Sequence, residues 1–344
     1  MTKAEPPEAV TVRSVARAAG VSIATVSRVM AGSAVVSEER TQRVLQVARD
    51  LGYRPDPIAR SLATGTSRRV AVIVPNLSNP YFYDIIRGIG RASTADGYTM
   101  TVADSMEDAA TERTLIADML QQADAMILVA PREDPARLTA LTHVHKPVLM
   151  LLGPRTQTAL PDLSVDNLVG MTALYEHLTG LGHRRVVYLS GPAGAWQNLR
   201  RLEAARRATE RGLEVVVVPA GGTIPAGYDA ADAAMAHRPT AVACFNDLVA
   251  LGVLHRLTEQ GVSVPADVSL TGFDDIDFSA YSSPALTTVR TPRERLGTEG
   301  WQALRRMIGG LPVAPAPAEL PAELVVRAST GPAGTGGGRP QASE

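Results

Sequence analysis

The sequence is poor in cysteine and in aromatic residues. Cys244 is the only cysteine among 344 residues, so no disulfide can form within the chain. A lone cysteine suits a reducing compartment, and we expect a cytoplasmic protein. Phe, Trp and Tyr together make up only 4% of the chain, so an aromatic side chain in a loop or at a helix start is a candidate for stacking on a ligand ring.

Long hydrophobic runs are absent as well. No stretch of eighteen apolar residues occurs, which argues against a transmembrane helix and against contact with a membrane. The first ten residues, MTKAEPPEAV, contain no apolar segment like that of a secretory signal. Hydrophobic residues still account for 45% of the chain, as in globular proteins with large cores. The length suggests two domains, or one large domain with an appendage.

Common enzyme signatures are also missing. The chain contains no G-x-x-x-x-G-K-S/T, no H-E-x-x-H and no G-x-S-x-G motif. RGIGRAST (87–94) lacks the last glycine of a dinucleotide fingerprint, and the acidic segment 274–281 lacks the glycine and glutamate of a calcium loop. We therefore expect no enzymatic activity, no cofactor and no metal. An enzyme remains the rival class, because doubly wound sheets also host dehydrogenases and kinases.

The net charge of −1 hides an uneven distribution. Residues 1–69 carry eleven basic and six acidic side chains, a net charge of +5, which leaves −6 for the other 275 residues. A basic segment on an acidic body favours a polyanionic partner for that segment. Chance clustering of charges on a solvated surface is the alternative.

Residues 11–52 predict three short helices. Thr11 is a typical N-cap, and Gly20 can end the first helix because glycine adopts a left-handed backbone without penalty. Ser22 caps a second helix that extends to about Ala31, and Ser37 caps a third. Such an arrangement is typical of a helix-turn-helix, although a three-helix cap without a DNA role is the alternative. The expected buried residues are Val12, Val15, Ala16, Ala19, Val26, Val29, Met30, Val44, Ala48 and Leu51.

The second of these helices has slim side chains at its start. Ile23, Ala24, Thr25 and Ser27 are small enough to enter a major groove, and Arg28 reaches further. An arginine can donate two hydrogen bonds to a guanine, whereas hydroxyl groups suit phosphates. This helix is therefore the predicted DNA-reading element.

The segment YRPDPIARSLATG (53–65) predicts one further short helix, capped by Asp56 with Pro57 at its first position. So short a helix is marginal in water, and folding on contact with DNA is a use for it. Leu62 could then wedge between base steps in the minor groove. A plain linker with Leu62 buried is the alternative.

Two stretches, VTVRSVARAAGVSIATVSRVM (10–30) and VSEERTQRVLQVARDLGYRPDPIARSLATG (36–65), resemble the DNA-binding head and hinge helix of the LacI/GalR family of bacterial transcription regulators. The resemblance implies that Ile23, Ala24 and Arg28 read bases and that Leu62 intercalates beside its copy in a dimer. The remaining DNA-binding residues that it implies are Thr11, Ser22, Thr25, Ser27, Ser37 and Ala59. Many relatives have asparagine where this chain has Ala31, so we expect one phosphate contact fewer.

From residue 70 onward, short apolar runs alternate with helical stretches. This alternation predicts parallel sheets covered by helices on both faces. Eight or more strands can form one barrel, one wide sheet or two lobes, and periodicity does not choose among them. The apolar runs are 70–74, 98–103, 125–130, 147–152, 185–190, 214–219, 240–245 and 267–273.

The segments NPYFYDIIRGI (79–89), CFNDLVALGVL (244–254) and VPADVSLTGFDD (264–275) resemble the periplasmic-binding-protein-like effector domain of the same family. In all, the resemblance extends over residues 10–328. It implies an α/β protein in which a small all-α helix-turn-helix head precedes a two-lobed type I effector domain of parallel doubly wound sheets.

The resemblance also implies a domain plan. We expect an N-lobe of about 70–165 and 290–317 and a C-lobe of about 166–289 and 320–328, with three crossings between them. The full set of expected parts is a disordered N-terminus (1–9), the head (10–54), the hinge helix and linker (55–69), the effector domain (70–328) and a disordered tail (329–344).

Open α/β sheets bind ligands beyond the carboxyl ends of their strands. Asp166, Asn246 and Asp274 each follow an apolar run and would hold a polar ligand there, and carboxylates suit the hydroxyls of a sugar. Arg201 matches the family arginine that reaches into the cleft from a helix start.

Two scarce aromatic residues complete the predicted effector site. Phe82 and Trp196 could stack on a ligand ring, while core packing of Phe82 and structural burial of Trp196 are the alternatives. Many sugar-binding relatives have an aromatic residue within the segment that here reads PAGGTIPAGYDA (219–230), and this chain has Gly222 and Ile224 instead.

Together these observations predict a homodimeric DNA-binding transcriptional regulator, a repressor in the first instance, whose affinity for operator DNA is controlled by a small polar effector. A sugar inducer is the first hypothesis because Asp166, Arg201 and Asp274 suit hydroxyl groups. A nucleobase corepressor is the second, and a sugar-binding or metabolic enzyme is the third. Tetramerising relatives of the family end in a leucine heptad helix, which this sequence does not show, so the resemblance implies a dimer rather than a tetramer.

Overall fold

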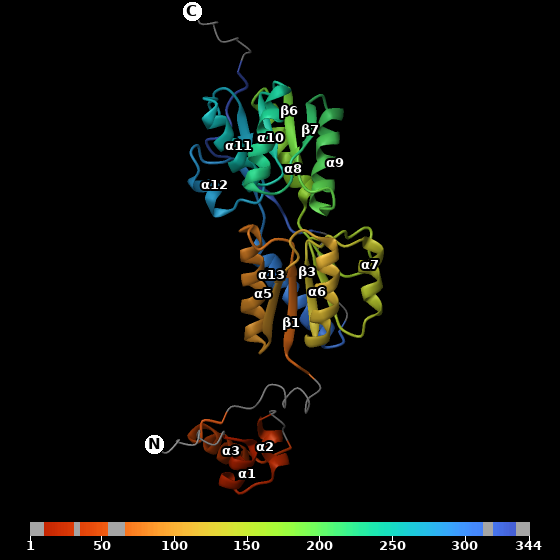
Figure 1. Ribbon diagram of the computed structural model, residues 1–344, viewed down its shortest axis with the longest axis vertical. Coiled ribbons are helices and arrows are strands. Elements are labelled where there is room, and N and C mark those ends of the chain that lie inside the picture. Colours follow the sequence, from red (N-terminus) through yellow and green to blue (C-terminus); the bar gives the residue numbers. More distant parts are fainter. Residues whose placement is uncertain (1–9, 31–34, 54–65, 312–318, 335–344) are drawn as a thin grey trace, which may run out of the picture. The chain divides into compact units, whose positions relative to one another are not determined.

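The computed structural model of the chain describes residues 10–30, 35–53, 66–311 and 319–334 (Figure 1). These residues form a small helical head and a larger α/β body, which we describe separately. The predictions for residues 1–9 and for Ala31, Ala59 and Leu62 lie outside the described residues. None of the described helices is long and apolar enough to cross a membrane.

The head consists of three helices around a small core. They are α1 (Val12–Ala19), α2 (Ile23–Met30) and α3 (Glu38–Asp50). As predicted, Thr11 is the N-cap of α1, and Gly20 follows it with a left-handed φ of 67°. The fully buried residues at the centre are Val15, Val26 and Val44. Their spacing places one valine of each helix in the core.

Two details of the predicted head differ in the structure. Ser37 is the N-cap residue of α3, as predicted, but its side chain makes no capping hydrogen bond. Leu51 is 38% exposed, because α3 ends at Asp50 and the chain turns at Gly52 with φ 66°. Tyr53, whose N–H donates to the carbonyl of Ala48 at 2.8 Å, packs against the core where Leu51 was expected.

The N-lobe of the body has a five-stranded sheet in the order β2-β1-β3-β4-β5. Trp301, Leu304 and Ile85 pack its strands against α5 and α13. The strands are β1 (Arg69–Val74), β2 (Thr99–Asp104), β3 (Ala125–Val129), β4 (Val148–Leu151) and β5 (Asp162–Leu163). The helices are α5 (Tyr81–Ala95), α6 (Ala109–Gln122), α7 (Pro135–Ala140) and α13 (Arg293–Ile308), with a 3-10 turn, η1 (Leu141–His143).

The C-lobe repeats this plan with a four-stranded parallel sheet in the order β7-β6-β8-β9. Its strands are β6 (Arg185–Ser190), β7 (Glu214–Pro219), β8 (Ala241–Cys244) and β9 (Ser269–Thr271). Its helices are α8 (Asn167–Gly180), α9 (Trp196–Glu210), α10 (Ile224–Ala236), α11 (Asp247–Glu259) and α12 (Asp277–Tyr281). The two lobes that the family resemblance implied are therefore confirmed.

Each lobe contains one pair of helices that approach at glycines. A Cβ on Gly88 of α5 would lie 2.2 Å from the carbonyl oxygen of Glu294, and one on Gly297 of α13 would lie 2.1 Å from that of Ile85. Gly227 and Gly252 bring α10 and α11 together in the same way. At these points the backbone of one helix lies directly against the backbone of the other, with no side chain between them.

Three segments join the lobes. Val165, which follows β5, bridges to Leu320, and β10 (Thr288–Arg290) pairs antiparallel with β11 (Glu323–Val325). Strands as short as β5, β10 and β11 carry too little pattern to be predicted from sequence.

The predicted disorder of the tail was wrong for residues 329–334. The hydroxyl of fully buried Ser329 accepts from the N–H of Thr287 at 2.8 Å and donates to the carbonyl of Leu270 at 2.6 Å. The N–H of Ala333 donates to the carbonyl of Leu181 at 2.9 Å. Backbone hydrogen bonds hold this segment on the C-lobe despite its small side chains. Residues 335–344 lie outside the described part.

Candidate functional site

Helix α2 exposes one face and buries the other. Val26 and Val29 face the head core, whereas Ile23, 45% exposed, lies at the helix start. We call the exposed residues Ile23, Ala24, Ser27 and Arg28 the outer face of α2. Thr25 is half-buried, and its hydroxyl lies 2.9 Å from that of Ser22, which caps the helix by accepting from the Thr25 N–H at 3.1 Å.

Most of the arginines that the structure describes in the head have no carboxylate partner among the described residues. Within the described residues, no carboxylate lies at ion-pair distance from Arg13, Arg17, Arg28 or Arg40, while Arg43 pairs with Glu39 at 2.9 Å. Solvated arginines of this kind can exchange counterions for phosphates. The assignment of Thr11, Ser22, Thr25 and the outer face of α2 to DNA contact stays a prediction, as does that of exposed Ser37.

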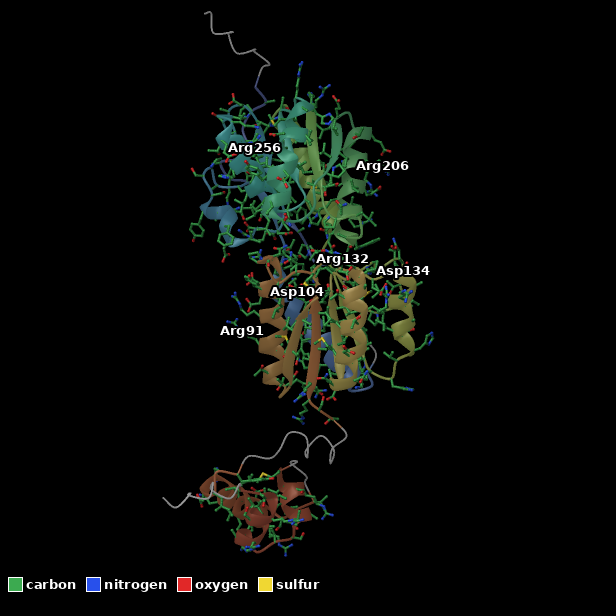
Figure 2. All side chains as sticks on the ribbon, viewed as in Figure 1. Arg91, Asp104, Arg132, Asp134, Arg206 and Arg256 are labelled. Atoms are coloured by element: carbon green, nitrogen blue, oxygen red, sulfur yellow. The ribbon has the colours of Figure 1, made fainter. Side chains whose placement is uncertain are left out.

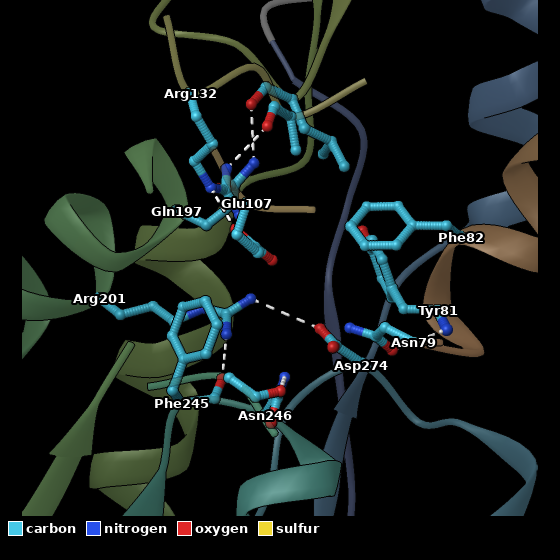
Figure 3. A pocket seen from close by; sticks show the side chains of 13 residues that line it. Asn79, Tyr81, Phe82, Glu107, Arg132, Gln197, Arg201, Phe245, Asn246 and Asp274 are labelled. Atoms are coloured by element: carbon cyan, nitrogen blue, oxygen red, sulfur yellow. Dashed lines mark hydrogen bonds and ion pairs between the residues drawn. The ribbon is translucent and has the colours of Figure 1, made fainter. Parts of the chain in front are cut away.

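The body has a pocket between its lobes with an empty volume of about 440 Å³, part of which opens to solvent (Figure 3). Its walls come from the segments that follow strands β1 to β4 and β6 to β9 at their carboxyl ends. This is where parallel sheets hold ligands. The lining residues are Asn79, Tyr81, Phe82, Glu107, Ala130, Arg132, Leu152, Gln197, Arg201, Gly222, Phe245, Asn246 and Asp274.

A buried ion pair forms the C-lobe wall of the pocket. The Arg201 guanidinium lies 3.5 Å from the Asp274 carboxylate, and both side chains are more than nine-tenths buried. Arg201 also donates to Asn167 Oδ1 at 2.9 and 3.1 Å and to the carbonyl of Phe245. Its charge lies 3.6 Å from the centre of the Phe273 ring. These contacts fix Arg201 so that Asp274 faces a rigid cation.

Burial raises the pKa of Asp274 to about 6, and the nearby charges of Arg201 and Arg293 limit the rise. The carboxyl is therefore largely ionised at neutral pH but titrates in mildly acidic solution. An ionised carboxylate accepts hydrogen bonds from ligand hydroxyls with both oxygens.

A second ion pair forms the N-lobe wall. Arg132 donates from Nε to Glu107 at 2.6 Å and from Nη1 to the carbonyl of Ala130 at 2.7 Å. The buried carboxylate of Glu112 holds this loop by accepting from the backbone N–H groups of Arg132 and Glu133 at 3.0 Å. Figure 2 shows Arg132 at the end of the N-lobe that meets the C-lobe.

Four of the six predicted effector residues line this pocket, namely Phe82, Arg201, Asn246 and Asp274. Asn246 is largely engaged, because it caps α11 through the Val249 N–H at 2.9 Å and donates to the carbonyl of Gly222 at 2.9 Å. A role in effector binding stays a prediction for all six residues.

The other two predicted effector residues, Asp166 and Trp196, do not line the pocket. The Asp166 carboxylate caps α8 by accepting from the Val169 N–H at 2.9 Å. Trp196 begins α9 but does not line the pocket, whereas Gln197 does and donates to the carbonyl of Leu152 at 2.7 Å.

Sequence reasoning missed several lining residues. Glu107 and Arg132 each follow a predicted apolar run and Phe245 is the last residue of one, so the strand-end rule applied to every run would have found them. Asn79 and Tyr81 lie beside Phe82, a predicted effector residue, at the start of α5. Within the described residues, no group of His, Cys, Asp and Glu side chains is arranged to hold a metal ion.

Comparison with known proteins covers both parts of the chain. Residues 11–56 match the family described as bacterial regulatory proteins, lacI family, and residues 175–330 match the periplasmic binding protein-like domain. The HTH-type transcriptional repressor CytR of Escherichia coli (strain K12) is 33% identical over 329 residues, which cover 94% of this chain and 96% of CytR.

Solved structures with the same fold include two transcription regulators. The lac repressor dimer bound to operator and the anti-inducer ONPF has a TM-score of 0.84 at 26% identity and covers 94% of this chain and 100% of its own. The CelR–cellobiose complex has a TM-score of 0.69 at 26% identity and covers 93% of this chain and 99% of its own.

Proposed function

Because this chain belongs to the LacI family of bacterial regulatory proteins and is a DNA-binding transcriptional repressor, we propose that a small uncharged polar metabolite controls its affinity for operator DNA. A sugar that acts as an inducer is the first candidate. We further propose that the pocket binds this effector without converting it, and that the protein works in the reducing cytoplasm.

The observation that carries the proposal is the charge balance of the pocket. Each lobe contributes one arginine–carboxylate pair, Arg132 with Glu107 and Arg201 with Asp274. Two paired cations and two paired anions leave no net charge for an ionic ligand to neutralise. They offer many donors and acceptors to hydroxyl groups, and the ring of Phe82 can cover the apolar face of a sugar.

A second candidate is a nucleobase or nucleoside that acts as a corepressor. Phe82 from the N-lobe and Phe245 from the C-lobe both line the pocket. Two phenyl rings from opposite walls favour a flat aromatic ligand, which can stack on either.

We propose that two copies of the chain bind a pseudo-palindromic operator, with the outer face of α2 of each copy in a major groove. The hinge residues Ala59 and Leu62 would enter the minor groove and bend the duplex. Closure of the lobes on the effector would change how two N-lobes pack, and so whether the hinges can fold. A coupling of about 1–3 kcal/mol corresponds to a 5–150-fold change in operator affinity.

A ligand screen tests this proposal. Thermal shift is measured against sugars, sugar phosphates, nucleosides and nucleobases, and hits are assayed for operator binding with a duplex selected from random DNA by the full-length protein. We expect a neutral sugar to stabilise the protein and to weaken operator binding. Sugar phosphates that bind better than their parent sugars would contradict the charge argument.

The Asp274→Ala variant connects the pocket to the response. It removes one carboxylate acceptor, so we expect it to lose the thermal shift and the operator response while unliganded operator binding stays within about threefold. Asp118→Ala, on the exposed surface of α6, is the matched control and should respond normally. Loss of operator binding by Asp274→Ala would indicate a folding defect instead.

A further inference from the structure

We propose that Arg293 is a positioning residue that transmits effector binding at Asp274 to helix α5 of the N-lobe. The inference rests on the proposed function of the pocket. It assigns a role to a network of hydrogen bonds behind the pocket wall that the effector itself would not touch.

The network begins at a strained turn of the C-lobe. Asp274 has φ 110° and Asp275 has φ 51°, and residues other than glycine rarely adopt such values. Two successive residues in this region stay there only if the surrounding structure holds them. The turn is therefore a place where a displaced side chain can change the backbone.

Arginines of the lobe-joining segments hold the side chain of Asp275. Its carboxylate accepts from Arg290 Nε at 2.6 Å and from Arg327 Nη2 at 2.5 Å. Arg290 belongs to β10, and Arg327 follows β11. Although burial raises the pKa of Asp275, the bonds to Arg327 and Arg290 outweigh that effect and lower it. Asp275 thus remains charged and tied to two connections between the lobes.

Arg293 holds the backbone of the same turn. Its Nη1 donates to the carbonyls of Asp274 at 2.7 Å and Asp275 at 2.9 Å. On its other edge, Nε and Nη2 lie 3.0 and 2.9 Å from Asp84 Oδ2. Arg293 begins α13 and Asp84 lies on α5, so one guanidinium joins the C-lobe turn to the N-lobe.

The two ends of this network meet the pocket. Asp274 places its carboxylate in the pocket and its carbonyl on Arg293. Asp84 lies two residues after Phe82, which lines the opposite wall. A ligand that draws the Asp274 carboxylate away from Arg201 must therefore shift the peptide that Arg293 holds. Since α5 and α13 touch backbone to backbone at Gly88 and Gly297, the helices follow as a block.

The role requires an arginine. A lysine ammonium has the same charge but cannot donate in parallel to two carbonyls on one side and a carboxylate on the other. Arg293→Lys and Asp84→Asn each remove one half of the connection. Arg91→Lys is the matched control, because Arg91 also joins α5 to α13, through Glu294 at 2.6 Å, without contact with the turn.

The first measurement needs no ligand. Hydrogen exchange of the full-length protein is compared among the variants. We expect Asp84→Asn to speed exchange of the Asp275 and Ile276 amides severalfold, although Asp84 touches neither residue, and Arg91→Lys to leave them unchanged. Exchange at these amides that is the same in Asp84→Asn and wild type would overturn the proposal.

The second measurement uses the effector found by the screen. In wild type we expect saturating effector to change operator affinity at least fivefold, and in both variants less than twofold, with effector affinity kept within about threefold. An unchanged ratio, or loss of effector binding with a lowered melting temperature in both variants, would overturn the role of Arg293. If no ligand changes the operator affinity of the wild type, the proposed function is contradicted. The role of Arg293 is then still tested by hydrogen exchange, because that measurement needs no ligand.

Discussion

Among the residues that the structure describes, most arginine side chains of the head extend into solvent without a carboxylate partner, whereas most of those in the body are bonded to one. In the head, Arg13, Arg17, Arg28 and Arg40 are exposed, and only Arg43 has an ion pair within the described residues. In the body, even outer helices pair theirs, as with Arg206 and Arg256, labelled in Figure 2. Other paired arginines of the body include Arg113, Arg132, Arg185, Arg293 and Arg327.

The difference separates two uses of one residue type. An unpaired, solvated guanidinium can bind a phosphate without first breaking an ion pair. It adds affinity for DNA that decreases as the salt concentration rises. A guanidinium bonded on two edges is fixed in place, and its removal leaves buried partners unpaired. The head thus keeps its described cations available for a polyanion, while in the body the paired cations Arg132 and Arg201 hold the pocket walls.

The largest effect is expected where the arginine is most buried. Arg201→Met leaves the carboxylate of Asp274 and the amide of Asn167 without their buried partner, so we expect a loss of about 3–5 kcal/mol in the free energy of unfolding of the body. Urea unfolding measures it. Arg200→Met, one position earlier and in no ion pair with the residues that the structure describes, should stay within about 0.5 kcal/mol of wild type. An equal loss of stability in Arg201→Met and Arg200→Met would contradict the distinction between paired and unpaired arginines.

A smaller effect is expected in the head. Arg28→Ala should weaken operator binding by about 1–3 kcal/mol and relax the preference at one base position, because the outer face of α2 loses its longest donor. Titration of the selected duplex and of single-base variants measures both. Arg43→Ala, whose guanidinium already pairs with Glu39, is the control. Unchanged base preference in Arg28→Ala would show that Arg28 binds only the backbone.

The smallest effect is a pH dependence of the pocket. Since the pKa of Asp274 is about 6, we expect effector affinity to fall about tenfold between pH 7 and pH 5 as the carboxylate is protonated. Calorimetric titration across this range measures the affinity. The Asp274→Asn variant should give a flat profile over the same range, and a wild-type affinity that rises on acidification would contradict an acceptor role for Asp274.

The stability contribution of Asp274 has the opposite sign. Burial raises its pKa in the folded protein above the unfolded value, so the folded state binds the proton more tightly. This stabilisation is complete below about pH 4 and is lost as the pH rises through about 6. The two pH profiles together distinguish protonation of Asp274 from acid unfolding of the body.

The sequence predicted the elements of the body well because its strands appear as continuous apolar runs. The run at 185–190 coincides with β6, which is buried from Val186 onward, and the run at 214–219 coincides with the partly exposed β7. The first helix of the head was predicted equally well, because the capping preference of Thr11 and the backbone preference of Gly20 act locally. The exposure of Leu51 could not be predicted, because it depends on where the chain turns after α3 and on Tyr53, which covers the core instead.

The pocket was only partly predictable. The strand-end rule led to Asp274 and Asn246, but it cannot tell a ligand-facing carboxylate from a helix cap such as Asp166. The direction of Trp196 depends on the first turn of α9, where the next residue, Gln197, faces the pocket instead. The connection through Arg293 could not be predicted from the sequence, because it joins residues more than two hundred positions apart in the chain.

The most direct test of the account is operator binding by the full-length protein with and without effector. A duplex selected from random DNA at low ionic strength is titrated in the presence of each stabilising ligand. We expect a two-fold symmetric site to be enriched and one neutral ligand to change its affinity at least fivefold. Enrichment of no symmetric site, or an affinity that no pocket ligand changes, would contradict the control of the head by the body.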